Sequence, residues 1–122
     1  MMKFPVALGL FVAVVTADIK LTPDERNCQM RQRASDKDVE MFHTMQRPVE
    51  RTTKCYYDCM MQVMGYSNGK RFIRDRFEDF YLSAAKNDDQ RRTIRHLADK
   101  CDGTEHDDAC ELAADIVACI RR

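Results

Sequence analysis

The sequence lacks the patterns that several large classes of protein require. No segment alternates β-branched and polar residues with the period of two that a half-buried strand needs. After the N-terminal residues, no apolar run approaches the roughly 20 residues that cross a bilayer. We therefore predict no stable membrane insertion. Basic and acidic residues number 20 each and are interspersed, so the sequence has no basic face for nucleic acid. These absences favour one all-α domain without internal repeats.

Catalytic motifs are missing as well. The chain has no Gly-x-Ser-x-Gly elbow, no His-Glu-x-x-His helix and no glycine loop that could cradle a phosphate. His43, His96 and His106 lie in polar contexts and share no metal-ligand spacing, so solvated histidines are the better interpretation. Several aspartates near His106 are at best a weak cation site, and a capped helix start explains them more simply. We predict no enzymatic activity, no catalytic residue, no metal and no cofactor.

The N-terminal residues have the pattern of a secretion signal. Lys3 supplies a positive charge, residues 4–15 form an apolar run, and residues 15–17 are short at the cleavage positions. A membrane anchor would need about 20 apolar residues, whereas this run ends at Asp18 and Lys20. We predict a signal peptide over residues 1–17, export, and one mature domain over residues 18–122.

All six cysteines follow this signal, and an even number in a short exported chain is typical of three disulfides. Cys55 and Cys59 are four residues apart, so a helix presents both on one face but holds them too far apart to bond each other. Cys110 and Cys119 are too distant along one helix to pair. Spacing alone leaves the remaining pairings open. Zinc binding by Cys-x3-Cys is the alternative, and export to an oxidising compartment argues against it.

Start and stop signals divide the first half of the chain into three helices. A capping box formed by Thr22 and Glu25 starts the first, which runs to about residue 34. Ser35 or Asp36 caps a second, short helix that Pro48 ends, with Val39, Phe42 and Met45 on one side. Thr52 or Thr53 starts the third, and Gly65 ends it. This third helix, with both cysteines of the Cys-x3-Cys pair, is the predicted hub of the fold.

Three more helices are predicted in the second half. The fourth runs from Lys70 to about residue 85, with an aromatic face that begins at Ile73. The fifth starts at Asn87 and is broken by Asp102 and Gly103. Residues 104–108 open the sixth. The inward faces are Ile73, Phe77, Phe80 and Tyr81 on the fourth, Ile94, Leu97, Ala98 and Cys101 on the fifth, and Cys110, Ala113, Ile116 or Val117, and Ile120 on the sixth.

The complete cysteine framework is Cys28-x26-Cys55-x3-Cys59-x41-Cys101-x8-Cys110-x8-Cys119. Its order and spacing resemble those of the insect odorant-binding proteins with six cysteines, the pheromone and general odorant-binding family, over the whole mature chain. The resemblance implies three pairs, which are Cys28–Cys59, Cys55–Cys110 and Cys101–Cys119. It also implies a compact bundle of about six helices around an apolar cavity. Only three residues follow the last cysteine, so we do not expect a C-terminal tail that folds into the cavity.

Methionine and aromatic side chains are the predicted ligand-binding residues. At any single position ordinary core packing is the simpler interpretation, but three disulfides would offset the cost of an internal cavity lined by such side chains. A tyrosine, with Tyr56, Tyr57, Tyr66 and Tyr81 as candidates, would orient the polar head of an alcohol, aldehyde or ester. The predicted ligand-binding residues are Met45, Tyr56, Met60, Met61, Met64, Phe72, Ile73, Phe77, Phe80, Tyr81, Ile94, Leu97, Val117 and Ile120.

The function that the resemblance implies is a secreted carrier of small hydrophobic molecules, such as odorants or pheromones, through sensory lymph to chemoreceptors. The expected partners are a semivolatile ligand and an odorant receptor, and the expected state is a monomer or weak homodimer. One alternative is a carrier or scavenger in another secretion, and another is a disulfide-rich effector that docks on a protein. Release controlled by pH through histidines and surface carboxylates is a further hypothesis.

Overall fold

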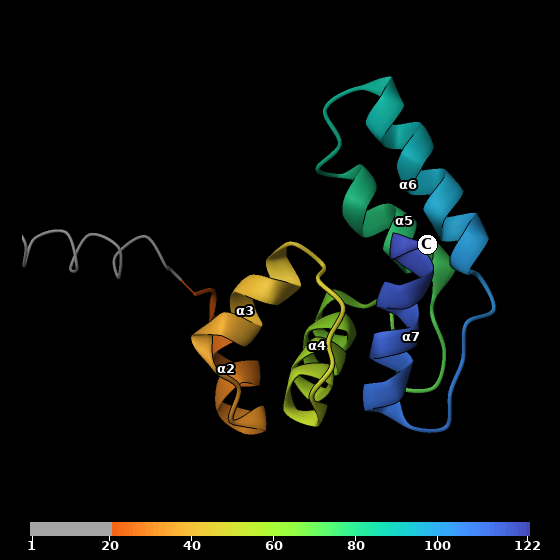
Figure 1. Cartoon of the computed structure of the whole chain (residues 1–122). Coiled ribbons are helices and arrows are strands. Elements are labelled where there is room, and N and C mark those ends of the chain that lie inside the picture. The colour runs from red at the N-terminus through yellow and green to blue at the C-terminus, as the bar shows by residue number, and fades with distance from the viewer. Residues whose placement is uncertain (1–20) are drawn as a thin grey trace, which may run out of the picture.

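A computed structural model describes residues 21–122, which form six α-helices and no extended strand (Figure 1). The helices are α2 (Pro23–Gln32), α3 (Asp36–His43), α4 (Arg51–Met64), α5 (Arg74–Leu82), α6 (Asp88–Cys101) and α7 (Ala109–Arg121). The predicted all-α class is confirmed for this part of the chain. The predicted signal peptide lies outside the described residues. Among the described helices, none combines the length and the apolar composition needed to cross a membrane.

Side-chain caps start the helices largely where the sequence predicted them. Thr22 and Glu25 form a complete capping box at α2, and Ser35 and Asp38 form a second one at α3. Asn87 accepts a hydrogen bond from the backbone of Gln90 at the start of α6, and Asp108 caps α7 in the same way. Each cap satisfies backbone N–H groups that the first turn leaves without a partner.

In the first half of the chain, the end of α3 and the start of α4 differ from the prediction. α3 stops at His43 rather than near Pro48, because Met45 takes a positive φ of 52° and the next backbone N–H donates to the carbonyl of Met41. This closes the helix end locally. α4 begins at Arg51 without a side-chain cap, and Thr53 instead donates to Asp38 at 2.6 Å. Gly65 ends α4 as predicted, with a φ of 95° that favours glycine.

The predicted start of the fourth helix at Lys70 is wrong. The segment before α5 is extended and folds back on itself through an isolated bridge of Ser67 with Phe72. It also pairs with the loop between α6 and α7 through an isolated bridge of Arg71 with Glu105. The backbone N–H of Phe72 donates to the carbonyl of Thr104 at 2.9 Å. These bonds to distant residues replace the first helical turn, so α5 begins only at Arg74, and it ends at Leu82 rather than near residue 85.

The helix α4 is the hub that its two cysteines predicted. Its buried side chains include Tyr56, Tyr57, Met60 and Met61, and it packs against α2, α3 and α7. The disulfides Cys28–Cys59, Cys55–Cys110 and Cys101–Cys119 tie α2 to α4, α4 to α7, and α6 to α7. The pairing implied by the family resemblance is therefore confirmed, as are both exclusions made from helix geometry.

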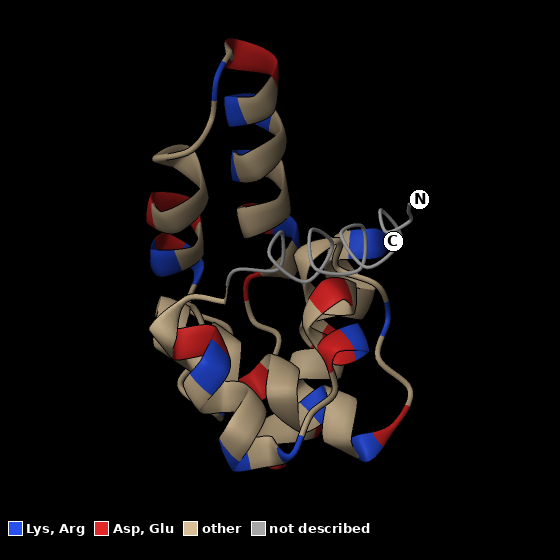
Figure 2. Cartoon of the chain, turned by 90° about the vertical axis from the view of Figure 1, so that its left-hand side faces the viewer, with Lys and Arg blue, Asp and Glu red and all other residues tan. Residues whose placement is uncertain are grey.

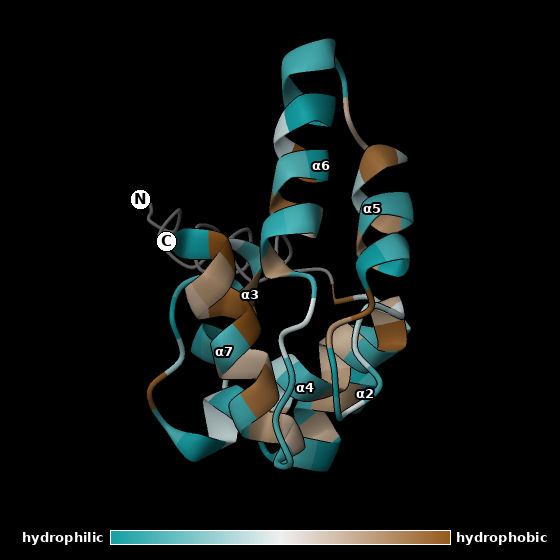
Figure 3. Ribbon diagram, turned by 90° about the vertical axis from the view of Figure 1, so that its right-hand side faces the viewer, coloured by the Kyte–Doolittle hydropathy of each residue, from teal (hydrophilic) through white to brown (hydrophobic). Residues whose placement is uncertain are grey.

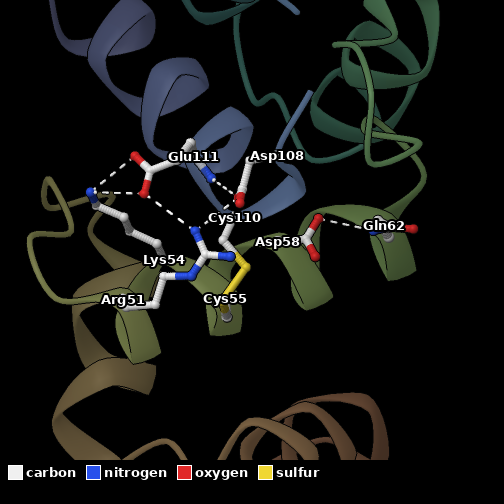
Figure 4. Close-up of a disulfide and its surroundings, with 8 residues drawn as sticks. All are labelled: Arg51, Lys54, Cys55, Asp58, Gln62, Asp108, Cys110 and Glu111. Atoms are coloured by element: carbon white, nitrogen blue, oxygen red, sulfur yellow. Dashed lines mark hydrogen bonds and ion pairs between the residues drawn. A yellow bond between two sulfur atoms is a disulfide. The ribbon is translucent and has the colours of Figure 1, made fainter. Parts of the chain in front are cut away.

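Ion pairs flank the disulfide between α4 and α7 (Figure 4). Arg51 lies 2.9 Å from Asp108, and Lys54 lies 3.1 Å from Glu111. The hydrogen bond from Arg51 holds the pKa of Asp108 at about 2. In the view of Figure 2, blue Lys and Arg and red Asp and Glu are interspersed over the helices. The distribution fits the balanced composition and a solvated surface.

The helices α5 and α6 form a hairpin that rises above the other four helices (Figures 1 and 2). The two helices pack on each other, and Arg74 of α5 bonds Asp99 of α6 at 2.7 Å. At its base the hairpin is held by the Cys101–Cys119 disulfide and by the packing of α6 against α7. The upper part of the hairpin is therefore supported mainly from within.

We expect the double substitution Cys101→Ser and Cys119→Ser to loosen this hairpin selectively. The disulfide closes a sequence separation of 18, so its loss should lower the free energy of unfolding by about 3 kcal/mol. Amide hydrogen exchange should accelerate in α5 and α6 more than in α4. The matched control is Cys55→Ser with Cys110→Ser, which should accelerate exchange in α4 and α7 first. Equal acceleration in all helices by both variants would contradict this division.

Candidate ligand-binding site

An aromatic cluster joins the base of the hairpin to the end of α4. It consists of Tyr66, Phe72, Phe77, Phe80 and Tyr81, with ring centroids 4.8 Å apart for Phe77 and Tyr81 and 5.3 Å apart for Tyr66 and Phe77. The hydroxyls of Tyr66 and Tyr81 lie 3.3 Å apart. Burial raises the pKa of both phenols. The cluster is therefore a neutral, mostly apolar wall with one internal hydrogen bond.

Half-buried apolar side chains border the core on several elements. We call six of them the rim residues, and they follow the end of α3 or lie on α4, α5, α6 and α7. Each packs against the core and keeps part of its surface accessible. Figure 3 shows the ribbon of α6 as mostly hydrophilic, interrupted by short hydrophobic segments. The rim residues are Met45, Met64, Tyr81, Ile94, Leu97 and Ile120.

A surface hollow with a mainly apolar lining lies between α5 and α6. It is open to solvent, has a volume of about 380 Å³, and includes the rim residues Tyr81 and Ile94. A larger hollow of about 480 Å³ near the start of α4 is lined by charged side chains such as Lys37 and Glu50. Ligand sites for small apolar molecules are mainly lined by apolar groups, so we take the α5–α6 hollow, with the rim residues Tyr81 and Ile94 in its lining, as the candidate site.

The predicted ligand-binding residues occupy three environments. One group is buried in the core, where its members are Tyr56, Met60, Met61, Phe72, Phe77 and Val117. A second group is half-buried, and it contains the rim residues together with Ile73. Phe80 is 40% exposed. The structure thus brings Phe72, Phe77 and Tyr81 together in the aromatic cluster, whereas Ile73 lies before α5 as its N-cap.

Small and polar residues of the hollow are absent from the predicted set. Ala84, Ala85, Gln90 and Thr93 line it beside Tyr81 and Ile94. Short alanines in the turn after α5 give no periodic apolar signal, and Gln90 and Thr93 look like surface positions of a helix. Only the proximity of the two hairpin arms shows that these residues share one surface.

Polar side chains gather on the opposite side of the core, between α2, α3 and α4. Glu25 is 8% exposed, and its carboxylate contacts Nε2 of His43. Burial raises the pKa of Glu25, but the bonds from His43 and from the Thr22 backbone outweigh it and leave the pKa below its usual value. His43 remains largely exposed, as predicted for a solvated histidine, yet it has this acidic partner. Burial likewise raises the pKa of Asp38, but hydrogen bonds from Thr53 and Ser35 outweigh this effect and leave the pKa below its usual value.

No metal centre emerges from these groups. Within residues 21–122, no three His, Cys, Asp or Glu side chains gather closely enough to hold an ion. All six cysteines are in disulfides. The polar side chains that line the α5–α6 hollow are Asp89, Gln90, Thr93 and the hydroxyl-bearing Tyr81, beside the apolar Ala84, Ala85 and Ile94.

The sequence model of the PBP/GOBP family matches residues 16–122. This chain belongs to the PBP/GOBP family. No curated protein matches the sequence. Among solved structures, this PBP/GOBP chain is similar to the odorant-binding protein dmelOBP28a from Drosophila melanogaster, with 19% identity and a TM-score of 0.68. That match covers 80% of this chain and 84% of the other, and at this identity it shows the fold alone.

We expect Glu25→Gln to remove a contact that ties α2 to α3 behind the site. At pH 7 the variant should lose about 1–2 kcal/mol of unfolding free energy, because a neutral amide replaces the carboxylate and the bond to His43 is no longer charge-assisted. The folded-state pKa of Glu25 is lowered, so its stabilisation is present above the unfolded-state value of 4.5 and is lost as the pH falls through the folded value.

Denaturant unfolding of both proteins between pH 7 and pH 3 would measure this effect. The difference between the wild type and Glu25→Gln should narrow below about pH 4.5. Asp24→Asn, in the same helical turn but exposed, is the control and should change stability less. A gap that stays constant down to pH 3 would show that the carboxylate is not the source of the effect.

Proposed function

We propose that this PBP/GOBP chain is a secreted carrier that binds a small hydrophobic molecule and releases it unchanged. In the olfactory form of the proposal, the ligand is an odorant or pheromone carried through sensory lymph to a chemoreceptor. Membership of the family supports the general role. The name of the structural neighbour, an odorant-binding protein, supports the same class of ligand.

One observation carries the proposal, which is the set of half-buried apolar rim residues around the core. Burial of apolar surface is the main favourable term in folding, at about 25 cal/mol per Å². Side chains that leave such surface accessible on α5, α6 and α7 forgo part of that stabilisation. An apolar ligand seated against Ile94, Leu97 and Ile120 would recover it, and binding would be driven by the same desolvation.

The disulfides make such a surface tolerable in a small protein. A chain with about 100 ordered residues has a small core, and side chains that pack incompletely reduce its stability further. Three disulfides contribute roughly 2–4 kcal/mol each by restricting the unfolded chain. The scaffold therefore has stability to offset a binding surface that folding alone would have covered.

The export part of the proposal makes a separate prediction. If residues 1–17 are a signal peptide, insect cells that express the whole chain should release a protein whose N-terminal residue is Asp18. N-terminal sequencing or intact mass spectrometry of the culture medium would measure this. Export would be contradicted if the protein stayed with the cells and kept Lys3, and if none of the protein appeared in the medium.

A charge placed on the rim should weaken ligand binding. In Ile94→Lys the ammonium group would have to be desolvated beside the ligand, and we expect at least tenfold weaker binding of the fluorescent probe N-phenyl-naphthylamine. Val49→Lys is the matched control, because Val49 is 80% exposed and lies before α4 rather than on the rim. Its affinity should equal that of the wild type.

Two results would contradict the carrier. One is the failure of the oxidised wild type to bind the probe or any of a panel of alcohols, aldehydes and fatty acids. The other is equal probe affinity for Ile94→Lys and the wild type, which would place the ligand elsewhere.

A further inference from the structure

Tyr56 carries a buried hydroxyl that the fold leaves without a partner. The residue lies in the middle of α4 and is 0% exposed. No protein atom among residues 21–122 accepts from or donates to its hydroxyl. Buried polar groups in proteins are nearly always hydrogen-bonded, since an unmade bond leaves the cost of desolvation uncompensated. Such a group therefore calls for a functional explanation.

The other tyrosines of the chain show that partners are within reach elsewhere. Tyr57, the next residue, donates to the backbone carbonyl of Gln46 at 2.6 Å. Tyr66 and Tyr81 lie within hydrogen-bonding distance of each other. All four tyrosines are in the described part of the chain, so Tyr56 is the exception among them.

The acids nearest to Tyr56 are already engaged. Burial raises the pKa of Tyr56, and the charges of Glu25 and Asp38 raise it further. The hydroxyl therefore stays protonated and can donate. Both oxygens of Glu25 are occupied, by the Thr22 backbone and by His43. Both oxygens of Asp38 are occupied as well, by Thr53 and by the Ser35 backbone. Neither acid accepts a hydrogen bond from Tyr56, so its hydroxyl remains available for an acceptor that is not part of this network.

Two methionines lead from Tyr56 along α4 to the rim residue Met64. Tyr56, Met60 and Met64 are four residues apart in turn, so they lie on one face of α4. Their burial decreases along the helix, from Tyr56 and Met60 in the core to Met64, a rim residue next to the helix end. At 1.5 Å per residue, Tyr56 and Met64 are about 12 Å apart along the axis. Methionine side chains are unbranched and adaptable, so this face can reshape around a chain-like molecule.

We propose that Tyr56 is the polar anchor of the ligand site and donates a hydrogen bond to the acceptor oxygen of the bound molecule. The ligand is then an apolar chain with one terminal aldehyde, ketone, ester or alcohol oxygen, and its chain lies along Met60 and Met64 with its far end at the rim. This inference rests on the carrier function proposed above. It assigns to one tyrosine the selection between a hydrocarbon and its oxygenated analogue.

The test compares octanal with octane, two ligands of matched chain length that differ in the acceptor. Competition with N-phenyl-naphthylamine gives both affinities for the wild type and for Tyr56→Phe, which removes only the oxygen. The ratio of octanal to octane affinity should fall about fivefold in the variant, the factor expected for one hydrogen bond. Octane affinity should be unchanged.

Tyr57→Phe is the matched control, because it also removes one buried phenol oxygen from α4. It breaks the bond to Gln46, so its unfolding temperature should fall while its octanal-to-octane ratio stays at the wild-type value. Tyr56→Phe breaks no bond in the unliganded protein and should unfold at the same temperature as the wild type, or higher.

Two outcomes would overturn the anchor while leaving the carrier in place. In the first, Tyr56→Phe binds octanal and octane in the wild-type ratio, which would mean that the hydroxyl meets only a trapped water. In the second, the variant unfolds at a lower temperature and loses affinity for both ligands equally, which would show a structural role. Failure of the wild type to bind the probe, octanal, octane and every ligand of the panel would instead overturn the carrier proposal, and the anchor with it.

Discussion

The fold depends on two disulfides that connect the helix α4 to two other helices. Cys59 of α4 bonds Cys28 of α2, and Cys55 of the same helix bonds Cys110 of α7. A helix prevents cysteines four residues apart from bonding each other, so each must find a partner on another element. The third disulfide then extends the connection from α7 to α6. Every described helix except α3 and α5 is linked covalently to this hub.

The capped starts of α2, α3, α6 and α7 and the disulfide framework could be predicted because their signals are local or specific to a family. The capping boxes at Thr22 and Ser35 follow from residues three positions apart. The extended segment before α5 could not be predicted, since its backbone bonds go to Thr104 and neighbouring residues of a distant loop. Local spacing there favoured a helix, and long-range pairing overrode it.

The candidate site was predictable in composition but not in arrangement. Periodicity identifies the apolar face of α7, yet it cannot tell that Val117 is buried while Ile120 stays half-exposed. It also cannot separate Tyr56 from Tyr57, which are neighbours with the same side chain. The difference between them is the position of one carbonyl, that of Gln46, which the backbone after α3 fixes. Such a difference is visible only when the loop is placed against α4.

The hairpin of α5 and α6 has a mechanical consequence. Its disulfide lies at Cys101, the last residue of α6, whereas Asp88 at the other end is about 20 Å away at 1.5 Å per residue. The covalent link thus fixes one end of α6, and this end acts as a pivot for the hairpin. A rotation of a few degrees at this pivot displaces the tip by an ångström or two without breaking any disulfide. In the proposed carrier, the position of Ile94 and Tyr81 relative to α4 would therefore depend on the angle of this hairpin, while the disulfides keep the hub fixed.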